Sequence, residues 1–148
     1  MIDSVNEADY PRLLEVWESA VKSTHDFLKI EDFEFYKSQM PTYFAHLKVY
    51  AYKDEQGSIR GFLGVADSKI EMLFVDDAFR GTGIGKILMN FAINELKIDK
   101  VDVNEQNEQA LGFYHRLGFK VVKRSACDEE GKDYPILHLE RSDSVKKK

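Results

Sequence analysis

The sequence has one cysteine, no long apolar run and no excess of positive charge. Its single cysteine, Cys127, cannot form an internal disulfide, so we expect a fold without structural disulfides. No stretch approaches the roughly 18 apolar residues that a membrane-spanning helix needs. The first residues, MIDSVNEADY, also lack the basic and apolar regions of a secretion signal. These absences predict a cytoplasmic protein that does not enter a membrane.

Acidic residues outnumber basic ones by 26 to 21, which gives a net charge of -5. This balance argues against a protein that neutralises the phosphates of a nucleic acid, and it favours a cationic partner. The four histidines, His25, His46, His115 and His138, lie too far apart in sequence for a pattern of metal ligands. We therefore predict no metal site and no nucleic-acid partner.

Helical and strand patterns alternate along the 148 residues, with no repeat and no linker that would divide them. The sequence predicts a single α/β domain over residues 1–141, followed by a disordered basic tail at 142–148. Helices are predicted at 7–22, at 31–44 with an end near Pro41, at 86–96 and at 107–118. Strands are predicted at 47–54, 59–68, 69–77, 100–105, 119–124 and 134–140, the first three as antiparallel neighbours.

The stretch FRGTGIGK places three glycines at alternate positions between a predicted strand and a predicted helix. Backbone N–H groups at the start of a helix are unpaired donors, and the absence of side chains lets an anion approach them closely. A Walker A loop is excluded, because Arg80 and Ile87 occupy two of its required positions. A dinucleotide fingerprint is excluded by Lys86 in place of its third glycine. A turn that only allows close helix packing is the alternative.

Two motifs in this order resemble the signatures of the GNAT family of N-acetyltransferases. Arg80-x-x-Gly83-x-Gly85 resembles the loop that binds the pyrophosphate of coenzyme A, between the fourth strand and the third helix of that family. The segment NEQNEQALGFYHRLGF resembles the second signature, an asparagine followed seven residues later by a tyrosine on a helix. The resemblance covers nearly the whole chain and is strongest to small, single-domain bacterial members.

The resemblance implies a mixed sheet of about seven strands with helices on both faces. In that fold the fourth and fifth strands, here KIEMLFV and KVDVN, splay apart, and the pantetheine arm of acetyl-CoA lies between them. Phe74 and Val75 would then contact the arm through their main chain, and Asn107 would hydrogen-bond it. The pyrophosphate would be bound by Arg80, Gly81, Thr82, Gly83, Ile84, Gly85 and Lys86.

The same resemblance implies that an amine attacks the thioester directly, which requires a proton acceptor and a donor to the leaving thiolate. Tyr114 is the predicted donor, and helical geometry places it within about 20° of the line through Asn107. Glu71 is the predicted base, because a carboxylate inside the apolar run IEMLFV would be costly to bury without a use or a partner. Strict strand alternation puts Glu71 on the face of Leu73 and Val75, opposite Ile70, Met72 and Phe74.

Several alternatives stay open at this point. The base is Glu71, His25 or a water molecule, and His25 lies in a region that lines the acceptor pocket in similar proteins. The acceptor is a primary amine, on a small molecule or on a lysine, and the acidic balance favours a cationic one. Two other functions compete with the enzyme: an acyl-CoA-binding module or sensor without turnover, and a nucleotide-phosphate binder that shares only the loop.

Overall fold

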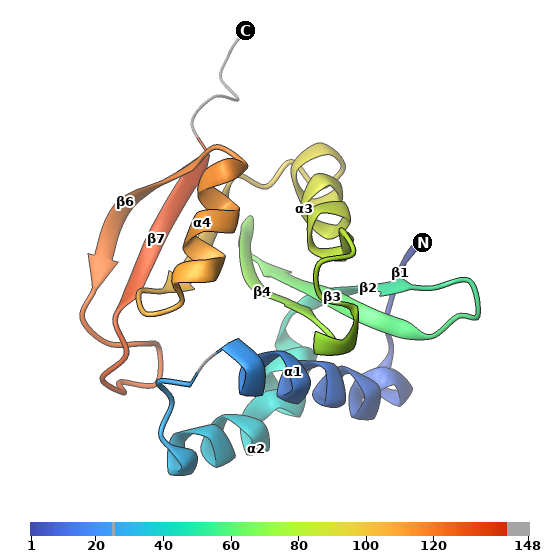
Figure 1. Ribbon diagram of the computed structural model, residues 1–148, viewed down its shortest axis with the longest axis horizontal. Coiled ribbons are helices and arrows are strands. Elements are labelled where there is room, and N and C mark those ends of the chain that lie inside the picture. Colours follow the sequence, from blue (N-terminus) through green and yellow to red (C-terminus); the bar gives the residue numbers. More distant parts are fainter. Residues whose placement is uncertain (25, 142–148) are drawn as a thin grey trace, which may run out of the picture.

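The computed structural model describes residues 1–24 and 26–141, whose strands form one mixed sheet with helices on both faces (Figure 1). The strands lie in the order β1-β2-β3-β4-β5-β7-β6. All neighbours are antiparallel except β4 and β5, which are parallel. The strands are β1 Ile2–Ser4, β2 Lys48–Lys53, β3 Ile59–Ala66, β4 Lys69–Val75, β5 Lys100–Asn104, β6 Phe119–Ser125 and β7 Ile136–Arg141. The predicted fold is confirmed.

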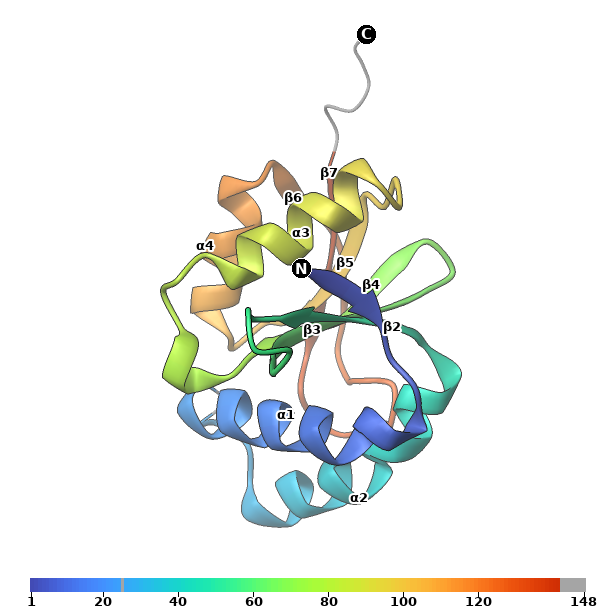
Figure 2. The same cartoon turned by 90° about the vertical axis from the view of Figure 1, so that its right-hand side faces the viewer.

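Two pairs of helices bury the two faces of the sheet (Figure 2). On one face lie α1 (Tyr10–Thr24), which follows the short 3₁₀ helix η1 (Glu7–Asp9), and α2 (Ile30–His46). The other face packs against α3 (Ile84–Asn94) and α4 (Glu108–Arg116). The helical spacing of apolar residues produces this arrangement, because it gives each helix one apolar side. Among the described residues, no helix has the length and apolar character needed to span a membrane.

The second predicted helix does not end near Pro41; α2 continues through it to His46. A proline inside a helix removes one backbone hydrogen bond and costs about 3 kcal/mol. The extra turn buries Phe44, which is 1% exposed and packs its ring 5.3 Å from Tyr10 and 5.6 Å from Phe62. Burial of an aromatic side chain on this scale offsets the cost of the proline.

The sequence pattern did not reveal β1, whose three residues are too few to show alternation. Ile2 and Ser4 pair with Tyr52 and Tyr50 of β2, so tertiary pairing defines this strand. It is the seventh strand that the family resemblance implied. Two other predictions, the acceptor-pocket role of His25 and the basic tail at 142–148, lie outside the described residues.

Strand β4 contains a bulge that makes the predicted alternation wrong at one position. Gly64 pairs with Met72 and the next residue, Val65, pairs with Ile70, so Glu71 is an extra residue without a partner on β3. A bulge of this kind interrupts the alternation of side chains between the two faces. Ile70 therefore packs in the same cluster as Leu73 and Val75, while Met72 and Phe74 pack in the other.

Strands β4 and β5 separate soon after they meet. Their ladder contains one residue pair, Ile70 with Val101, although β4 continues to Val75 and β5 to Asn104. Figure 1 shows the β6–β7 hairpin turned away from the direction of β2, β3 and β4. The splayed strands that the resemblance implied are therefore present, and the edge of β4 beyond Ile70 has no described strand beside it.

Candidate active site

A cavity of about 590 Å³ lies where β4 and β5 separate, and it brings together four of the predicted site residues. Glu71 and Phe74 line it from β4, Asn107 from the start of α4, and Tyr114 from the body of α4. Other walls come from α1, the segment that joins α1 to α2, α2 and the β6–β7 loop, and their side chains include Trp17, Val21, Leu28, Tyr36, Met40, Tyr43, Asp128, Glu129, Glu130 and Tyr134. The loop at residues 80–86 does not line this cavity.

Tyr114 is 6% exposed and its ring packs between those of Phe113 and Phe119. Among the described residues, no donor or acceptor contacts its hydroxyl group. Burial raises the pKa of Tyr114 above its ordinary value, so the phenol stays protonated at neutral pH. His115, one position further along α4, lines a separate apolar hollow with Phe119. Tyr114 therefore presents a protonated hydroxyl group to the cavity.

Glu71 occupies the bulge in β4 and its side chain is 22% exposed. Burial raises the pKa of Glu71, the ammonium group of Lys69 at 3.5 Å opposes the rise, and the carboxylates of Glu129 and Asp102 add to it. Carboxylate oxygens of Glu71, Asp102 and Glu129 all lie within 4.8 Å of one another. Glu71 is thus a stronger base than an ordinary glutamate, and it lies beside the carboxylates of Asp102 and Glu129.

Asp102 of β5 links this cluster to the neighbouring strands. Its Oδ2 lies 2.8 Å from Lys69 Nζ, and its Oδ1 lies 2.7 Å from His138 Nδ1. The other ring nitrogen of His138 lies 2.7 Å from Ser125 Oγ. Sequence reasoning missed this network and the position of Glu129, because its members come from four strands and a loop and have no local spacing in common.

Asn107 was predicted to lie on the same helix as Tyr114, but it lies one residue before α4, as the N-cap. Its Oδ1 accepts a hydrogen bond from the Ala110 N–H at 3.1 Å, which satisfies one of the unpaired donors of the first turn. Both Asn107 and Tyr114 line the cavity. The asparagine oxygen is used for capping.

The glycine-rich stretch joins the 3₁₀ turn η2 (Asp77–Phe79) to α3. Among the described residues, the N–H groups of positions 81–86 have no hydrogen-bond acceptor. Gly81 and Gly83 have φ values of 79° and 90°, which residues with a Cβ rarely adopt, and Gly83 is the N-cap of α3. A Cβ at either position would meet nothing within 4 Å, so the space beside the backbone is open. Open donors at a helix N-terminus fit a phosphate group.

The remaining residues of this stretch differ in what they offer. The Ile84 side chain is buried in the core, so only its backbone faces the loop. Gly85 lies under the ring of Phe113, where an added Cβ would make an ordinary contact at 3.5 Å. The side chains of Arg80 and Lys86 are exposed, and Thr82 Oγ1 donates to the Phe79 carbonyl at 2.5 Å. Two exposed cations therefore flank the open donors.

The β6–β7 loop is attached to α2 by tyrosine–carboxylate hydrogen bonds. The Tyr36 hydroxyl donates to Asp128, and the Tyr43 hydroxyl donates to Glu130 at 2.5 Å. Tyr134 of the loop donates to Asp32 of α2 at 2.5 Å. Burial and the adjacent carboxylates raise the pKa values of Tyr36 and Tyr43, which keeps both hydroxyls as donors. These bonds therefore join two elements that both line the cavity.

Residues 21–135 match the family model described as "Acetyltransferase (GNAT) domain". The chain belongs to the GNAT family of acetyltransferases. A relative named peptidyl-lysine N-acetyltransferase YjaB, from Escherichia coli, is 35% identical to this GNAT chain over 127 residues, which is 86% of each protein. The solution structure of apo-form YjaB from Escherichia coli superimposes with a TM-score of 0.89 and 32% identity, and covers 96% of this chain and 97% of YjaB.

The GNAT fold is also shared with the PaiA N-acetyltransferase of Thermoplasma acidophilum, solved in complex with coenzyme A. That structure gives a TM-score of 0.67 at 19% identity, over 95% of this chain and 98% of its own. This GNAT chain is thus an N-acetyltransferase that uses acetyl-CoA and an amine acceptor. The predicted family, activity and cofactor are confirmed, and the roles of individual residues stay predictions.

Proposed function

We propose that the enzyme acetylates the side-chain amine of lysine in a protein or peptide, with the transfer taking place in the cavity between β4 and β5. One observation carries this proposal: Glu71 and Tyr114 line the same cavity at the point where the two strands separate. A base and a proton donor in one cavity are what direct attack by an amine requires.

Acetyl-CoA would bind chiefly through backbone groups near the cavity that have no hydrogen-bond partner among the described residues. The N–H groups of residues 81–86 would hold the pyrophosphate, with Arg80 and Lys86 adding positive charge. The main chain of Phe74 and Val75 lies on the free edge of β4, where an extended pantetheine arm would add like a strand. Asn107 stands beside this path as the N-cap of α4. Bound acetyl-CoA supplies the activated acetyl thioester.

Glu71 would accept the proton that the acceptor amine must lose before it attacks. A lysine ammonium group has a pKa of about 10.4, so nearly all of it arrives protonated at neutral pH. The raised pKa of Glu71 makes its carboxylate a better proton acceptor than an ordinary glutamate. The Tyr114 hydroxyl, which has no other described partner, would donate a hydrogen bond to the departing thiolate.

The charge of the cavity supports a cationic acceptor. Glu71, Asp102 and Glu129 converge there, and Lys69 is the cation that contacts the first two. A lysine ammonium group would meet the excess of negative charge, and its aliphatic chain would meet the apolar wall that includes Trp17. The name of the 35% identical relative, a peptidyl-lysine N-acetyltransferase, supports a lysine within a polypeptide.

An acceptor assay tests this proposal. We expect free thiol release from acetyl-CoA with lysine-containing peptides, and at least about tenfold lower kcat/KM with peptides in which lysine is replaced by norleucine or already acetylated. Polyamines and amino sugars are the comparison acceptors. Efficient turnover of a polyamine or an amino sugar without any turnover of peptides would contradict the lysine acceptor and leave the N-acetyltransferase activity intact.

Cofactor binding gives a second expected result. At 100 times its Kd, acetyl-CoA should add about 2.7 kcal/mol to the free energy of unfolding, because it binds only the folded state. Thermal unfolding with acetyl-CoA, ATP and NAD measures this. Stabilisation by ATP or NAD without any by acetyl-CoA would favour a nucleotide-phosphate binder, and stabilisation by acetyl-CoA without thiol release would favour a non-catalytic module.

Replacement of the loop glycines should have unequal effects. Gly83→Val forces a β-branched residue into the left-handed region at φ 90°, so we expect about a tenfold or greater loss of acetyl-CoA affinity. Gly85→Ala makes only an ordinary contact with Phe113 and should weaken binding less than threefold. Calorimetric titration of the folded variants measures both. Wild-type affinity in Gly83→Val would mean that the loop is only a packing turn.

A further inference from the structure

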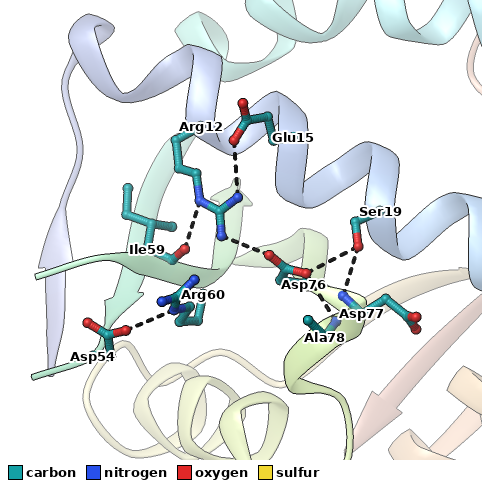
Figure 3. A network of polar contacts seen from close by, with 9 residues as sticks. All are labelled: Arg12, Glu15, Ser19, Asp54, Ile59, Arg60, Asp76, Asp77 and Ala78. Carbon is teal, nitrogen blue, oxygen red and sulfur yellow. Dashed lines mark hydrogen bonds and ion pairs between the residues drawn. The ribbon is translucent and has the colours of Figure 1, made fainter. Parts of the chain in front are cut away.

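A network of hydrogen bonds joins α1 to the turn that precedes the glycine loop (Figure 3). Asp76, the residue after β4, receives a bond from Arg12 Nη2 at 2.8 Å on one carboxylate oxygen. Its other oxygen accepts from Ser19 Oγ at 3.2 Å and from the Ala78 N–H at 3.1 Å. Ser19 Oγ in turn accepts from the Asp77 N–H at 2.9 Å. We call Arg12, Ser19 and Asp76 the α1 clamp.

The clamp is partly buried and its charges are matched. The side chains of Arg12 and Asp76 are 30% and 15% exposed. Burial alone would raise the pKa of Asp76, but the bonds from Arg12 and from the Ala78 N–H hold that pKa below its usual range. Arg12 Nε also donates to the Ile59 carbonyl of β3 at 3.0 Å, so the guanidinium group joins α1, β3 and the turn.

The clamp residues on α1 lie on one side of the helix. Arg12 and Ser19 are seven residues apart, and Ser23 follows four residues later, so all three lie within about 40° of one line along α1. Ser23 continues the contact toward the loop, because Arg80 Nη1 donates to it at 3.4 Å and to Asp77 at 3.0 Å. Trp17 and Val21, which line the cavity, lie on the opposite side of α1.

The loop itself has few other contacts that would fix it. At its end, α3 is anchored by the buried side chains of Ile84 and Leu88. Between the turn and α3, a Cβ added at Gly81 or Gly83 would meet no atom within 4 Å. The start of the loop is held by the clamp and by Arg60, whose guanidinium carbon lies 4.2 Å over the Phe79 ring. Donors must be fixed before binding if their ordering is not to reduce affinity.

We propose that Arg12, Ser19 and Asp76 are positioning residues for acetyl-CoA, which hold the turn at 76–80 so that the N–H groups of residues 81–86 face the pyrophosphate. The inference rests on the proposed role of the loop and extends it to residues that do not contact the cofactor. None of the three is adjacent in sequence to the glycines, and Arg12 and Asp76 are separated by 64 positions.

Calorimetric titration with coenzyme A and steady-state kinetics test the clamp. Asp76→Ala removes the three hydrogen bonds that the Asp76 carboxylate accepts, from Arg12, Ser19 and the Ala78 N–H, and should raise the Kd about 10- to 50-fold. Asp76→Asn and Ser19→Ala should raise it about 3- to 10-fold. At saturating acetyl-CoA, kcat should stay within threefold of the wild type and the acceptor KM within twofold. Arg12→Lys, which keeps the charge, should bind more tightly than Arg12→Met. If Asp76→Ala does not fold, the two milder variants decide.

Glu18→Gln is the matched control. It removes an α1 carboxylate that pairs with Lys22 at 2.9 Å and Lys37 at 3.1 Å but does not contact the turn, so its Kd should equal that of the wild type. A lower melting temperature with an unchanged Kd in the clamp variants would show a purely structural role and overturn the proposal. Gly83→Val separates the clamp proposal from the proposed role of the loop. If Gly83→Val weakens coenzyme A binding and the clamp variants do not, only the clamp proposal is wrong. Wild-type affinity in Gly83→Val and in the clamp variants would mean that the loop is not the pyrophosphate site.

Discussion

Tyr114→Phe is expected to lower kcat by roughly 10 to 1,000 fold, the scale of a single proton donor, while acetyl-CoA affinity stays within about twofold. The phenylalanine keeps the ring contacts with Phe113 and Phe119, so little apolar contact is lost. Only the hydroxyl that faces the cavity is removed. Rapid-quench or steady-state measurement of kcat, together with calorimetric titration of coenzyme A, separates the two effects.

The raised pKa of Tyr114 specifies what the hydroxyl does. A phenol with a pKa above about 10 is a weaker acid than a thiol with a pKa near 8.5, so complete proton transfer to the thiolate is unfavourable. The phenol is then a hydrogen-bond donor that stabilises the developing negative charge on sulfur. We therefore expect the wild-type kcat to show no titration of Tyr114 below about pH 9.

Tyr50→Phe is the control for the loss of a tyrosine hydroxyl from the core. Tyr50 packs against Phe91 beneath α3 and does not line the cavity, so its replacement should leave kcat unchanged. Full activity in Tyr114→Phe would contradict the proposed role and leave the thiolate to depart without a donor from this residue.

Local sequence signals were sufficient for most of the fold. The period of apolar residues in α1, α3 and α4 and the alternation in β2 and β3 predicted elements that the structure confirms. The glycine-rich stretch was predicted to lie between a strand and a helix, and it does precede α3. These features depend on neighbours within a few residues, which is why the sequence alone reveals them.

Features that depend on distant residues were not predictable in this way. The bulge at Glu71 is defined by the register of β4 against β3, and no glycine or proline within β4 marks it. The cluster around Asp102 and the α1 clamp join residues from separate elements. The continuation of α2 past Pro41 depends on the burial of Phe44 against the sheet, a tertiary contact that overrides local preference.

Glu71→Gln should lower kcat/KM at neutral pH by roughly 100 to 1,000 fold, because the amide cannot accept the ammonium proton. In the wild type, the carboxylate must be deprotonated to act, and its pKa is raised. Activity should therefore fall as the pH drops through a value above the ordinary glutamate pKa of about 4.3. We call this fall in kcat/KM at low pH the acid limb. In Glu71→Gln the acid limb caused by Glu71 should be lost. Instead, kcat/KM should rise about tenfold per pH unit up to the amine pKa, because more of the acceptor amine is already neutral.

Glu129→Gln separates the effect of neighbouring charges on the pKa of Glu71 from the role of Glu71 as proton acceptor. Two carboxylates lie near Glu71: Glu129 of the β6–β7 loop and Asp102 of β5. Asp102 in turn contacts His138 of β7, and Lys69 of β4 contacts Glu71 directly. Loss of the Glu129 charge removes one cause of the raised pKa, so the acid limb should move to lower pH without disappearing.

The pH dependence of kcat/KM, measured for the wild type, Glu71→Gln and Glu129→Gln with one lysine peptide, tests both statements. Tyr114→Phe should keep the acid limb and show no recovery at high pH, because it leaves proton removal from the amine intact. A Glu71→Gln enzyme with wild-type rates at neutral pH would exclude Glu71 as the base. His25 or an ordered water would then be the next candidate, and the raised pKa of Glu71 would reflect only its burial and the neighbouring carboxylates of Glu129 and Asp102.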